Sequence, residues 1–446
     1  MSVQRVLLVP THRTGLANAI AGAAAEVLSA RGEQVRYHHL GPLSPSSCWD
    51  RWEGTAFLDP ALYSRESLLD LWDVATRGAG LSLLSSEVGL LDRREGTSWV
   101  PVDVARMLDC PIVLVVDCRG WGTSIRALAS GIRSACAGLN LAAAILTGVA
   151  NKDHLDLLRP LFTEESLPVV GCLFVGDGPE WDTPAPGAWG LPLDAALVDA
   201  VSRQVDLRGL VSVAGQRGFL PPQNSLVDRG DDGPVVAVAG GKGFGLWSRD
   251  SVEVLRAAGA QVRRVDLIED LALPEGTAGL VLAGTVWPAA LPDIAMNTAL
   301  LGRIHAEVQR GMPTLALGGG ELILLNRVQD LLGRTSDMAA VIPAEGEILW
   351  DLEDPVYVAA VAGAGSVLLG KGDALTGWVL TDAEVVGDGG RWGSPLVTPE
   401  DGSGCQAEDV ASSSLFCSRI LFHLASNPLM AGRFVRRCAA FAGRLG

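Results

Sequence analysis

The 446-residue sequence contains no apolar run of about 18 residues, the length that a membrane-spanning helix needs. No basic segment followed by an apolar core opens the chain, so we expect no secretory signal and a cytoplasmic protein. Basic residues are scarce, with 35 Lys and Arg against 51 Asp and Glu and a net charge of −16. This balance argues against a nucleic-acid partner, because such a partner requires a large positively charged surface.

Paired cysteines are also lacking. The chain has eight cysteines but no C-x-x-C pair and no spacing with histidine that is typical of zinc sites. Several lie in apolar stretches, so we expect buried, reduced thiols and no structural zinc. The eight residues are Cys48, Cys110, Cys118, Cys136, Cys172, Cys405, Cys417 and Cys438.

What the sequence does contain is typical of a packed globular protein. Apolar residues make up 48% and charged residues 19% of the chain, which excludes a disordered protein. The length predicts two or three domains.

Apolar strands alternate with helical patterns through the first part of the chain, which predicts a mostly parallel, doubly wound sheet. Ligands of such sheets bind beyond the carboxyl ends of the strands. The predicted strands are 5–11, 34–40, 81–92, 111–120, 141–149 and 168–175, and the helices between them are 15–32, 67–78, 101–110, 124–138 and 153–165.

A segment rich in Pro, Gly and Asp interrupts this alternation, and a second α/β pattern follows it. We therefore predict a first domain at 1–205, a linker at 206–233 and a second domain at 234–446. In the second domain, 312–328 reads as a strand that turns sharply into a helix through three glycines. The chain ends in a predicted helix at 427–445, with Asn427 as its cap and Pro428 in its first turn.

Four stretches carry a family resemblance: "SSEVGLLDRREG", "DVARMLDCPIVLVVDCRG", "LPEGTAGLVLAGTVWP" and "SLFCSRILFHLASNPLMAGRFV". With them, nearly the whole chain resembles the cobyrinic acid a,c-diamide synthase family. The resemblance implies an ATP-dependent amidoligase domain of the P-loop, dethiobiotin-synthetase type. A class I glutaminase-like, flavodoxin-like α/β domain would follow it.

The phosphate loop departs from the family pattern. A P-loop needs a lysine and a Ser or Thr after its last glycine, to contact the phosphates and Mg²⁺. Gly15 is present, but Ala17 and Asn18 stand at those two positions, within one residue. The turn either joins the first strand to the first helix without further role or binds an anion weakly. The candidate residues for weak cofactor binding are Thr11, His12, Arg13, Thr14, Gly15, Asn18 and Asp117.

The acidic positions of the family are only partly filled. Leu43 stands where the resemblance implies an acid after Gly-Pro, and His39 where it implies a lysine. Glu87 matches the Mg²⁺-associated glutamate and is the one candidate metal ligand, while Asp117 also matches. Helix capping or a local ion pair is the alternative role for both carboxylates. Thr147 replaces an asparagine associated with the nucleotide base.

The glutaminase-like half also departs from the family pattern at its catalytic positions. The resemblance implies a cysteine nucleophile at the tip of the strand–helix elbow, with a histidine as its base. Gly318 stands at the cysteine position, and Glu321 lies one turn into the helix. Leu421 stands at the first histidine position, whereas the second histidine is present as His423.

The sequence therefore predicts a homologue of the family that does not catalyse the family reaction. It would act as a binding, regulatory or assembly protein, with no cofactor, as a homodimer or as a heteromer with an active relative. The alternative is an amidotransferase or amidoligase that uses ATP and Mg²⁺ with ammonia or a glutaminase supplied in trans. Trp121, Trp247 and Trp287 follow strands. Packing is the expected role of each one alone, and together they would line an apolar cleft for a small molecule.

Overall fold

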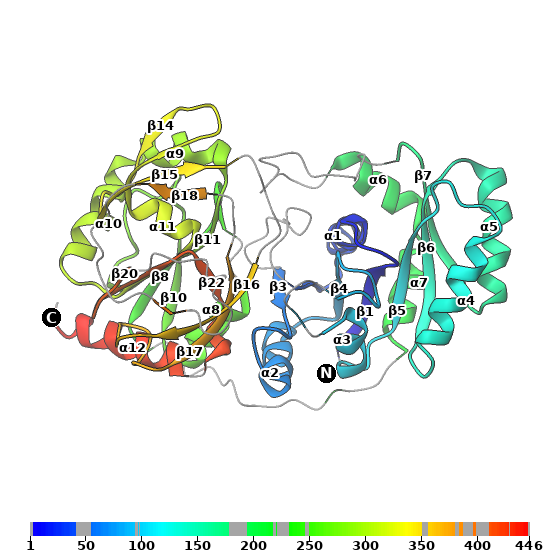
Figure 1. Cartoon of the computed structure of the whole chain (residues 1–446), viewed down its shortest axis with the longest axis horizontal. Coiled ribbons are helices and arrows are strands. Elements are labelled where there is room, and N and C mark those ends of the chain that lie inside the picture. The colour runs from blue at the N-terminus through cyan, green and yellow to red at the C-terminus, as the bar shows by residue number, and fades with distance from the viewer. Residues whose placement is uncertain are drawn as a thin grey trace.

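The chain folds into two α/β halves that lie side by side along the long axis of the molecule (Figure 1). The computed structural model describes residues 3–41, 55–93, 97, 99–177, 194–216, 220, 232–245, 249–349, 356–379, 383–386, 396–397, 410–427 and 429–444.

A seven-stranded sheet forms the first half, with the order β3-β2-β4-β1-β5-β6-β7. All six neighbouring pairs run parallel, as the alternation of strands and helices predicts. β3, next to β2 at one edge of the sheet, was not predicted from the sequence. The strands are β1 (Gln4–Pro10), β2 (Val35–Leu40), β3 (Thr55–Leu58), β4 (Leu81–Ser85), β5 (Ile112–Asp117), β6 (Leu141–Val149) and β7 (Val169–Phe174).

Helices cover both faces of this sheet. Helices α1 (Leu16–Ala30), α6 (Ala195–Gln204) and α7 (Leu207–Ala214) pack in one apolar cluster. Helices α2 (Arg65–Ala75), α3 (Pro101–Met107), α4 (Ile125–Ala135) and α5 (Lys152–Glu164) pack in the other. The doubly wound fold predicted for the first half is therefore confirmed.

The predicted linker begins too early. Residues 207–214, inside the predicted linker 206–233, form α7, and Asp206 caps this helix by accepting a hydrogen bond from the Gly209 N–H. Leu207 and Leu210 of α7 are buried against the first sheet. The burial of these apolar residues stabilises a helix here although the surrounding composition is polar. The first half therefore extends to at least Gln216. Most of the remaining segment lies outside the described residues.

A second, mostly parallel sheet forms the centre of the second half, with the order β10-β8-β11-β12-β21-β20. Within this order of described strands the edge pair β20–β21 is antiparallel and the other pairs are parallel, and β9 pairs antiparallel with β11 off this path. The strands are β8 (Val235–Ala239), β9 (Phe244–Gly245), β10 (Gln261–Val265), β11 (Thr277–Val286), β12 (Thr314–Gly318), β20 (Val410–Ala411) and β21 (Leu415–Ser418).

Two smaller sheets of four strands complete the strand content of this half, in the orders β14-β13-β15-β18 and β19-β16-β17-β22. Their strands are β13 (Leu325–Gln329), β14 (Thr335–Asp337), β15 (Ile342–Ile348), β16 (Val356–Ala362), β17 (Ala374–Val379), β18 (Ala383–Val386), β19 (Leu396–Val397) and β22 (Ile420–Phe422).

The helices of the second half include the predicted C-terminal helix. The Asn427 side chain accepts a hydrogen bond from the Leu429 N–H at 3.1 Å, as expected for its cap. The helices are α8 (Arg249–Ala257), α9 (Leu291–Met296), α10 (Thr298–Gln309), α11 (Gly319–Leu324) and α12 (Leu429–Ala442), with short 3-10 turns η2 (Pro288–Ala290) and η3 (Leu424–Ser426).

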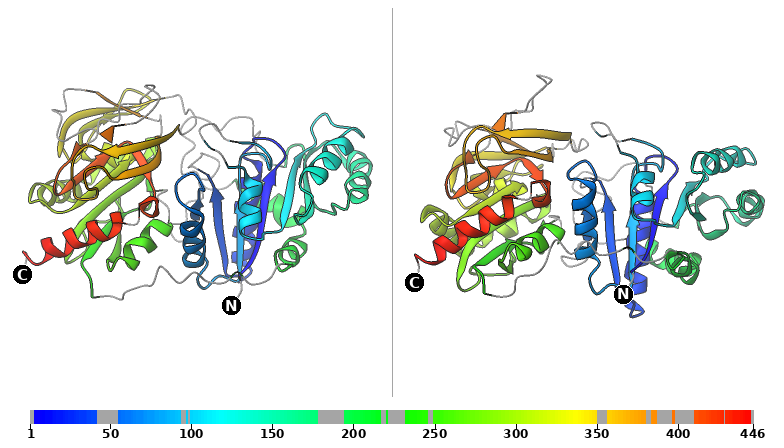
Figure 2. Two further views of the ribbon diagram at one scale, coloured as in Figure 1. Left: turned by 60° about the horizontal axis from the view of Figure 1, so that its bottom comes forward. Right: turned by 90° about the horizontal axis from the view of Figure 1, so that it is seen from below.

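The two halves share one apolar core. A single cluster of buried side chains runs from the α2–α5 face of the first sheet into the second half. Helix α8 contacts both α2 and β3 across the boundary, and Figure 2 shows these elements facing each other in two further views. Among the helices of the described residues, none is long and apolar enough to cross a membrane.

Candidate active sites of the two halves

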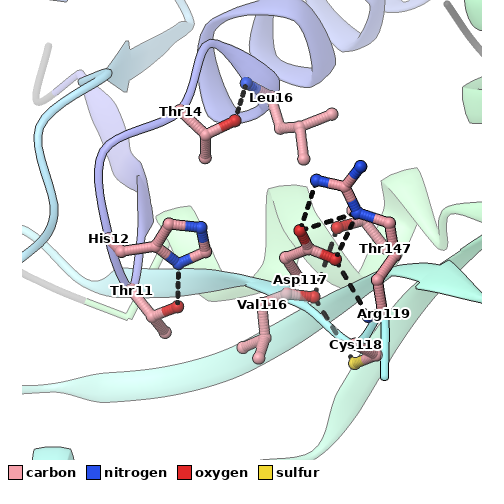
Figure 3. Close-up of polar contacts among 9 residues, drawn as sticks. All are labelled: Thr11, His12, Thr14, Leu16, Val116, Asp117, Cys118, Arg119 and Thr147. Carbon is pink, nitrogen blue, oxygen red and sulfur yellow. Dashed lines mark hydrogen bonds and ion pairs between the residues drawn. The ribbon is translucent and has the colours of Figure 1, made fainter. Parts of the chain in front are cut away.

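The loop between β1 and α1 occupies the place of a phosphate loop at the carboxyl edge of the first sheet. Its backbone is tied to neighbouring strands: the Thr11 N–H bonds to the Val115 carbonyl, and the Thr14 N–H bonds to the Glu87 carbonyl at 2.9 Å. His12 and Arg13 are exposed, and His12 Nδ1 lies 3.3 Å from Thr11 Oγ1 (Figure 3). Thr14 Oγ1 accepts from the Leu16 N–H, just after Gly15 at the start of α1.

The two positions of the missing P-loop side chains are buried. Ala17 is fully buried, and Asn18 is only 1% exposed. Ser85 donates a hydrogen bond to Asn18 Oδ1 at 2.7 Å, and the same hydroxyl lies 2.8 Å from the Tyr37 hydroxyl. Asn18 therefore belongs to a hydrogen-bonded chain inside the sheet and does not face the loop as an Mg²⁺ ligand would.

Asp117 lies at the end of β5, beside the loop, and is held by Arg119. The Asp117 carboxylate accepts from the Arg119 side chain at 2.7–3.1 Å and from the Arg119 N–H at 3.0 Å (Figure 3). Partial burial raises the pKa of Asp117, but the hydrogen bonds from Arg119 outweigh it, so this pKa lies below its ordinary value. Sequence reasoning missed Arg119, although its place two residues after Asp117 was the available signal.

Glu87 follows β4 and is also matched by an arginine, since Arg13 Nη2 lies 3.7 Å from Glu87 Oε1. Among the described residues, no group of three or more His, Cys, Asp or Glu side chains is placed to hold a metal ion. Glu87, the candidate metal ligand, thus lies near Arg13, and Asp117, a candidate for cofactor binding, is paired with Arg119.

The remaining predicted positions of the first half are buried where they are described. His39 is fully buried in β2. Thr147 is buried in β6 and donates a hydrogen bond to the Val116 carbonyl at 3.2 Å. Leu43 lies outside the described residues.

The elbow of the second half has the sharp turn predicted from its glycines. Gly318 ends β12 with φ +58° and ψ −121°, a backbone conformation that disfavours residues with a Cβ. A Cβ on Gly319 would lie 2.6 Å from the Val286 nitrogen, and one on Gly320 would lie 1.7 Å from the Leu282 carbonyl oxygen. The glycine run thus lets α11 pack directly on β11. The predicted helix is short, because the chain enters β13 at Leu325.

Leu421 lies against the tip of the elbow. Its Cδ1 is 3.6 Å from the position of a Cβ on Gly318, and Leu421 is 1% exposed. The structure thus brings together the residues at the two positions where the family resemblance implies a nucleophile and a base. Glu321, in the first turn of α11, is also buried.

His423 follows β22 and is buried among partners of its own. Its Nδ1 accepts a hydrogen bond from the Ala425 N–H at 3.0 Å, and its Nε2 lies 3.7 Å from Asp250 Oδ2. Burial lowers the pKa of His423 to about 3. A general base works best with a pKa near the working pH, so His423 is poorly suited to that role.

Trp121 and Trp287 are not among the residues that line one open groove of the described residues. This groove, of about 470 Å³, lies between α1 and α6, and Glu26, Arg31, Asp199 and Ser202 are among its lining residues. Trp121 is 39% exposed, Trp287 is partly buried, and Trp247 lies outside the described residues. The six described cysteines are buried and free, as predicted, whereas Cys48 and Cys405 lie outside the described residues.

These features define the class of the protein: a two-domain α/β chain with a P-loop-type amidoligase-like half and a class I glutaminase-like half. No family model matches the chain. The chain is 28% identical to the hydrogenobyrinate a,c-diamide synthase of Thermobifida fusca, over 95% of this chain and 93% of that protein. It is 27% identical to the Streptomyces coelicolor enzyme of the same name over 97% of each chain. The Caldanaerobacter subterraneus cobyrinate a,c-diamide synthase is 24% identical, over 84% of this chain and 85% of that protein.

The chain is therefore similar over nearly its whole length to cobyrinate and hydrogenobyrinate a,c-diamide synthases, which confirms the predicted resemblance. Among solved structures, PurLQS from Thermotoga maritima matches 48% of this chain and 99% of its own, with 14% identity and a TM-score of 0.32. A match this weak does not decide the fold, which rests on the strand orders described above.

Proposed function

We propose that this chain is a member of the a,c-diamide synthase family that does not catalyse the family reaction and acts through binding, regulation or assembly. The observation that carries the proposal is the elbow: Gly318 offers no nucleophile, and Leu421 packs where a base would be needed. Glutamine hydrolysis by this class of site depends on both groups, and losing either lowers the rate by orders of magnitude.

The buried state of His423 supports the same proposal. Its Nδ1 accepts a hydrogen bond from the Ala425 N–H, the Asp250 carboxylate lies 3.7 Å from its Nε2, and its pKa near 3 keeps it neutral at physiological pH. A neutral imidazole of such low basicity accepts a proton from a thiol only at a large energetic cost.

The first half supports the proposal through its charges. A nucleotide–Mg²⁺ complex needs free carboxylates and a lysine near its phosphates. Here Arg119 engages Asp117, Arg13 approaches Glu87, and Ala17 takes the place of the lysine. Binding of Mg²⁺ would have to break both arginine contacts.

Two assays test the proposal together. Isothermal calorimetry with ATP, with and without Mg²⁺, should give no tight binding, and a glutaminase assay should give no glutamate above the buffer control. Tight ATP binding with ADP release, or glutamine turnover, would sink the proposal. The T. fusca synthase, assayed in parallel, serves as the positive control.

The alternative is an ATP-dependent amidoligase supplied with ammonia or with a glutaminase in trans. It is motivated by Glu87 and Asp117, which flank the loop at the carboxyl edge of the sheet. ATP-dependent amide formation on hydrogenobyrinate or cobyrinate with ammonium chloride would support it. Absence of both ADP and amide with these tetrapyrrole carboxylates would remove its support.

An assembly role predicts a partner, either a second copy of this chain or an active relative. Light scattering after size exclusion should then show a dimer, or a heteromer when a family synthase is co-expressed. A strictly monomeric protein that leaves the activity of that synthase unchanged would contradict this part of the proposal.

A further inference from the structure

A cluster of polar side chains, four of them buried and one half-buried, lies where the two halves of the chain meet. We call it the boundary cluster, and it consists of Asp59 and Tyr63 from the first half and Asp250, Tyr357 and His423 from the second. The chain has three tyrosines in all, and two of them lie in this cluster.

The first half contributes a short turn after β3. Asp59 is fully buried, and its Oδ1 accepts a hydrogen bond from the Ala61 N–H at 3.0 Å. The Asp59 N–H donates to the Tyr63 hydroxyl at 2.8 Å, which fixes the phenol ring just before α2. The contacts that orient both side chains therefore lie within the first half.

The second half contributes residues from three separate elements. Asp250, fully buried in the first turn of α8, lies 3.7 Å from Nε2 of His423, which precedes η3. Tyr357 projects from β16. Contacts between α8 and η3 hold the first two of these elements together.

Two side-chain contacts in this cluster join the halves directly. The Tyr357 hydroxyl donates a hydrogen bond to Asp59 Oδ2 at 2.6 Å, across 298 residues of sequence. The Tyr63 ring meets the His423 ring edge to face, with centroids 5.2 Å apart and an interplanar angle of 67°. Asp250 is also close enough to Tyr63 for its charge to raise the pKa of the phenol, after burial itself.

Burial makes these contacts difficult to exchange for others. A buried carboxylate is costly unless donors or cations stabilise it, and Asp59 takes one donor from the opposite half. Sliding the halves past each other would remove the Tyr357 donor from Asp59 and the Tyr63 ring from His423. Apolar contacts around the cluster would permit many relative positions, whereas these directional contacts select one.

We propose that the boundary cluster is a latch that fixes the two halves in one relative position, and that His423 serves this contact instead of proton transfer. The latch does not depend on whether the chain catalyses a reaction. The latch gives His423 a physical role in this chain, namely contact between the halves, although Leu421 two residues before it is apolar.

Hydrogen–deuterium exchange of the full chain tests the latch with Tyr357→Phe, which removes only the hydroxyl that bridges the halves. Amide exchange in α2 and α8, the helices that face each other at the boundary, should accelerate about tenfold. That is the change expected from losing one hydrogen bond to a charged group. Exchange in β1 and β12, inside each half, should stay at the wild-type rate.

Tyr37→Phe is the control, because it removes a hydroxyl bonded to Ser85 within the first half, from a ring that is more deeply buried than the half-buried Tyr357 ring. It should leave exchange in α8 unchanged. Wild-type exchange in α2 and α8 of Tyr357→Phe, or equal acceleration in Tyr37→Phe, would overturn the proposal.

A second variant, His423→Leu, probes the other contact and should accelerate exchange in α2 as well as in α8. If acceleration were confined to the second half, then the histidine would stabilise only its own half and its part in the latch would be refuted. Should His423→Leu fail to fold, the Tyr357→Phe result alone still decides the proposal.

Discussion

At the scale of single residues, Gly318 meets two demands at once. Its φ of +58° is disfavoured for residues with a side chain, and a Cβ would approach the Gly284 carbonyl oxygen to 2.8 Å. The space at the tip of the elbow therefore fits a glycine, and a cysteine there would require the backbone of β11 to shift.

Gly318→Cys should lower the free energy of unfolding by about 1–3 kcal/mol and should not produce glutaminase activity. The strain comes from the backbone, and the missing activity comes from Leu421, which offers no base. Urea unfolding and a coupled glutamate assay measure the two effects. Gly318→Ala, which adds the strain without a thiol, should be destabilised to a similar extent. Glutamine turnover by the cysteine variant would show that another residue acts as the base.

Arg119 provides a second test at this scale, because it controls the charge of Asp117. Arg119→Ala should raise the pKa of Asp117, since burial is then opposed by the backbone N–H of residue 119 but no longer by the guanidinium and its hydrogen bonds. Carboxyl NMR titration of the labelled protein measures this pKa. Arg126→Ala, which removes an exposed arginine paired with Glu164 and Glu165, should leave the pKa of Asp117 unchanged. An equal rise in both variants would contradict the local role of Arg119.

At the scale of elements, the contact of α11 with β11 depends on the absence of side chains. A Cβ on Gly320 would overlap the Leu282 carbonyl, at 1.7 Å, so the helix can approach the strand only with glycine there. The three glycines that suggest a catalytic elbow in the sequence are thus explained by helix–strand packing alone.

Gly320→Ala should therefore destabilise the protein by about 1–3 kcal/mol or more, through overpacking. Gly302→Ala is the control, because Gly302 lies within α10 and a Cβ there would meet no atom within 4 Å. That substitution should be neutral or stabilising by up to about 1 kcal/mol, since alanine has the higher helix propensity. Thermal and urea unfolding of the two variants measure the contrast, and equal stabilities would refute the packing argument.

The elements were largely predictable from sequence, since buried strands and amphipathic helices each have their own apolar period. The exceptions have local causes: α7 lies where polar and glycine residues obscure its four buried apolar residues, and β3 is only four residues long. The positions of Gly318 and Leu421 were predicted through the family resemblance. The pairing of Arg13 with Glu87 and of Tyr357 with Asp59 was not, because such contacts depend on how distant segments meet in three dimensions.

At the scale of the whole molecule, the boundary cluster links stability to pH. Burial lowers the pKa of His423 from 6.5 to about 3, and burial together with Asp250 raises the pKa of Tyr63 well above 10.0. Both shifts favour the neutral side chains in the folded state. Below pH 6.5 His423 binds a proton in the unfolded chain but not in the folded chain. The free energy of unfolding therefore falls as the pH is lowered toward 3. Above pH 10 the unfolded chain loses the Tyr63 proton first, so stability falls again.

Urea unfolding of the wild type between pH 4 and pH 7 should show this acid loss, and His423→Leu should reduce its slope. Between pH 9 and pH 11, Tyr63→Phe should reduce the alkaline slope in the same way. If the slopes of the variants equal that of the wild type, the titration of these two side chains does not contribute to the pH dependence.

The contact between Asp59 and Tyr357 also has a consequence for the folding of the chain during translation. Their 298 residues of separation mean that, at about 5–20 residues per second on the ribosome, Asp59 emerges about 15–60 seconds before its partner. During this interval the first half completes its own sheet, and the surface of α2 and β3 that α8 will cover stays open to water until α8 has been synthesised. The nascent chain thus exposes an apolar surface for part of its synthesis, and chaperone capture during translation should concentrate there and end once the second half has folded against it.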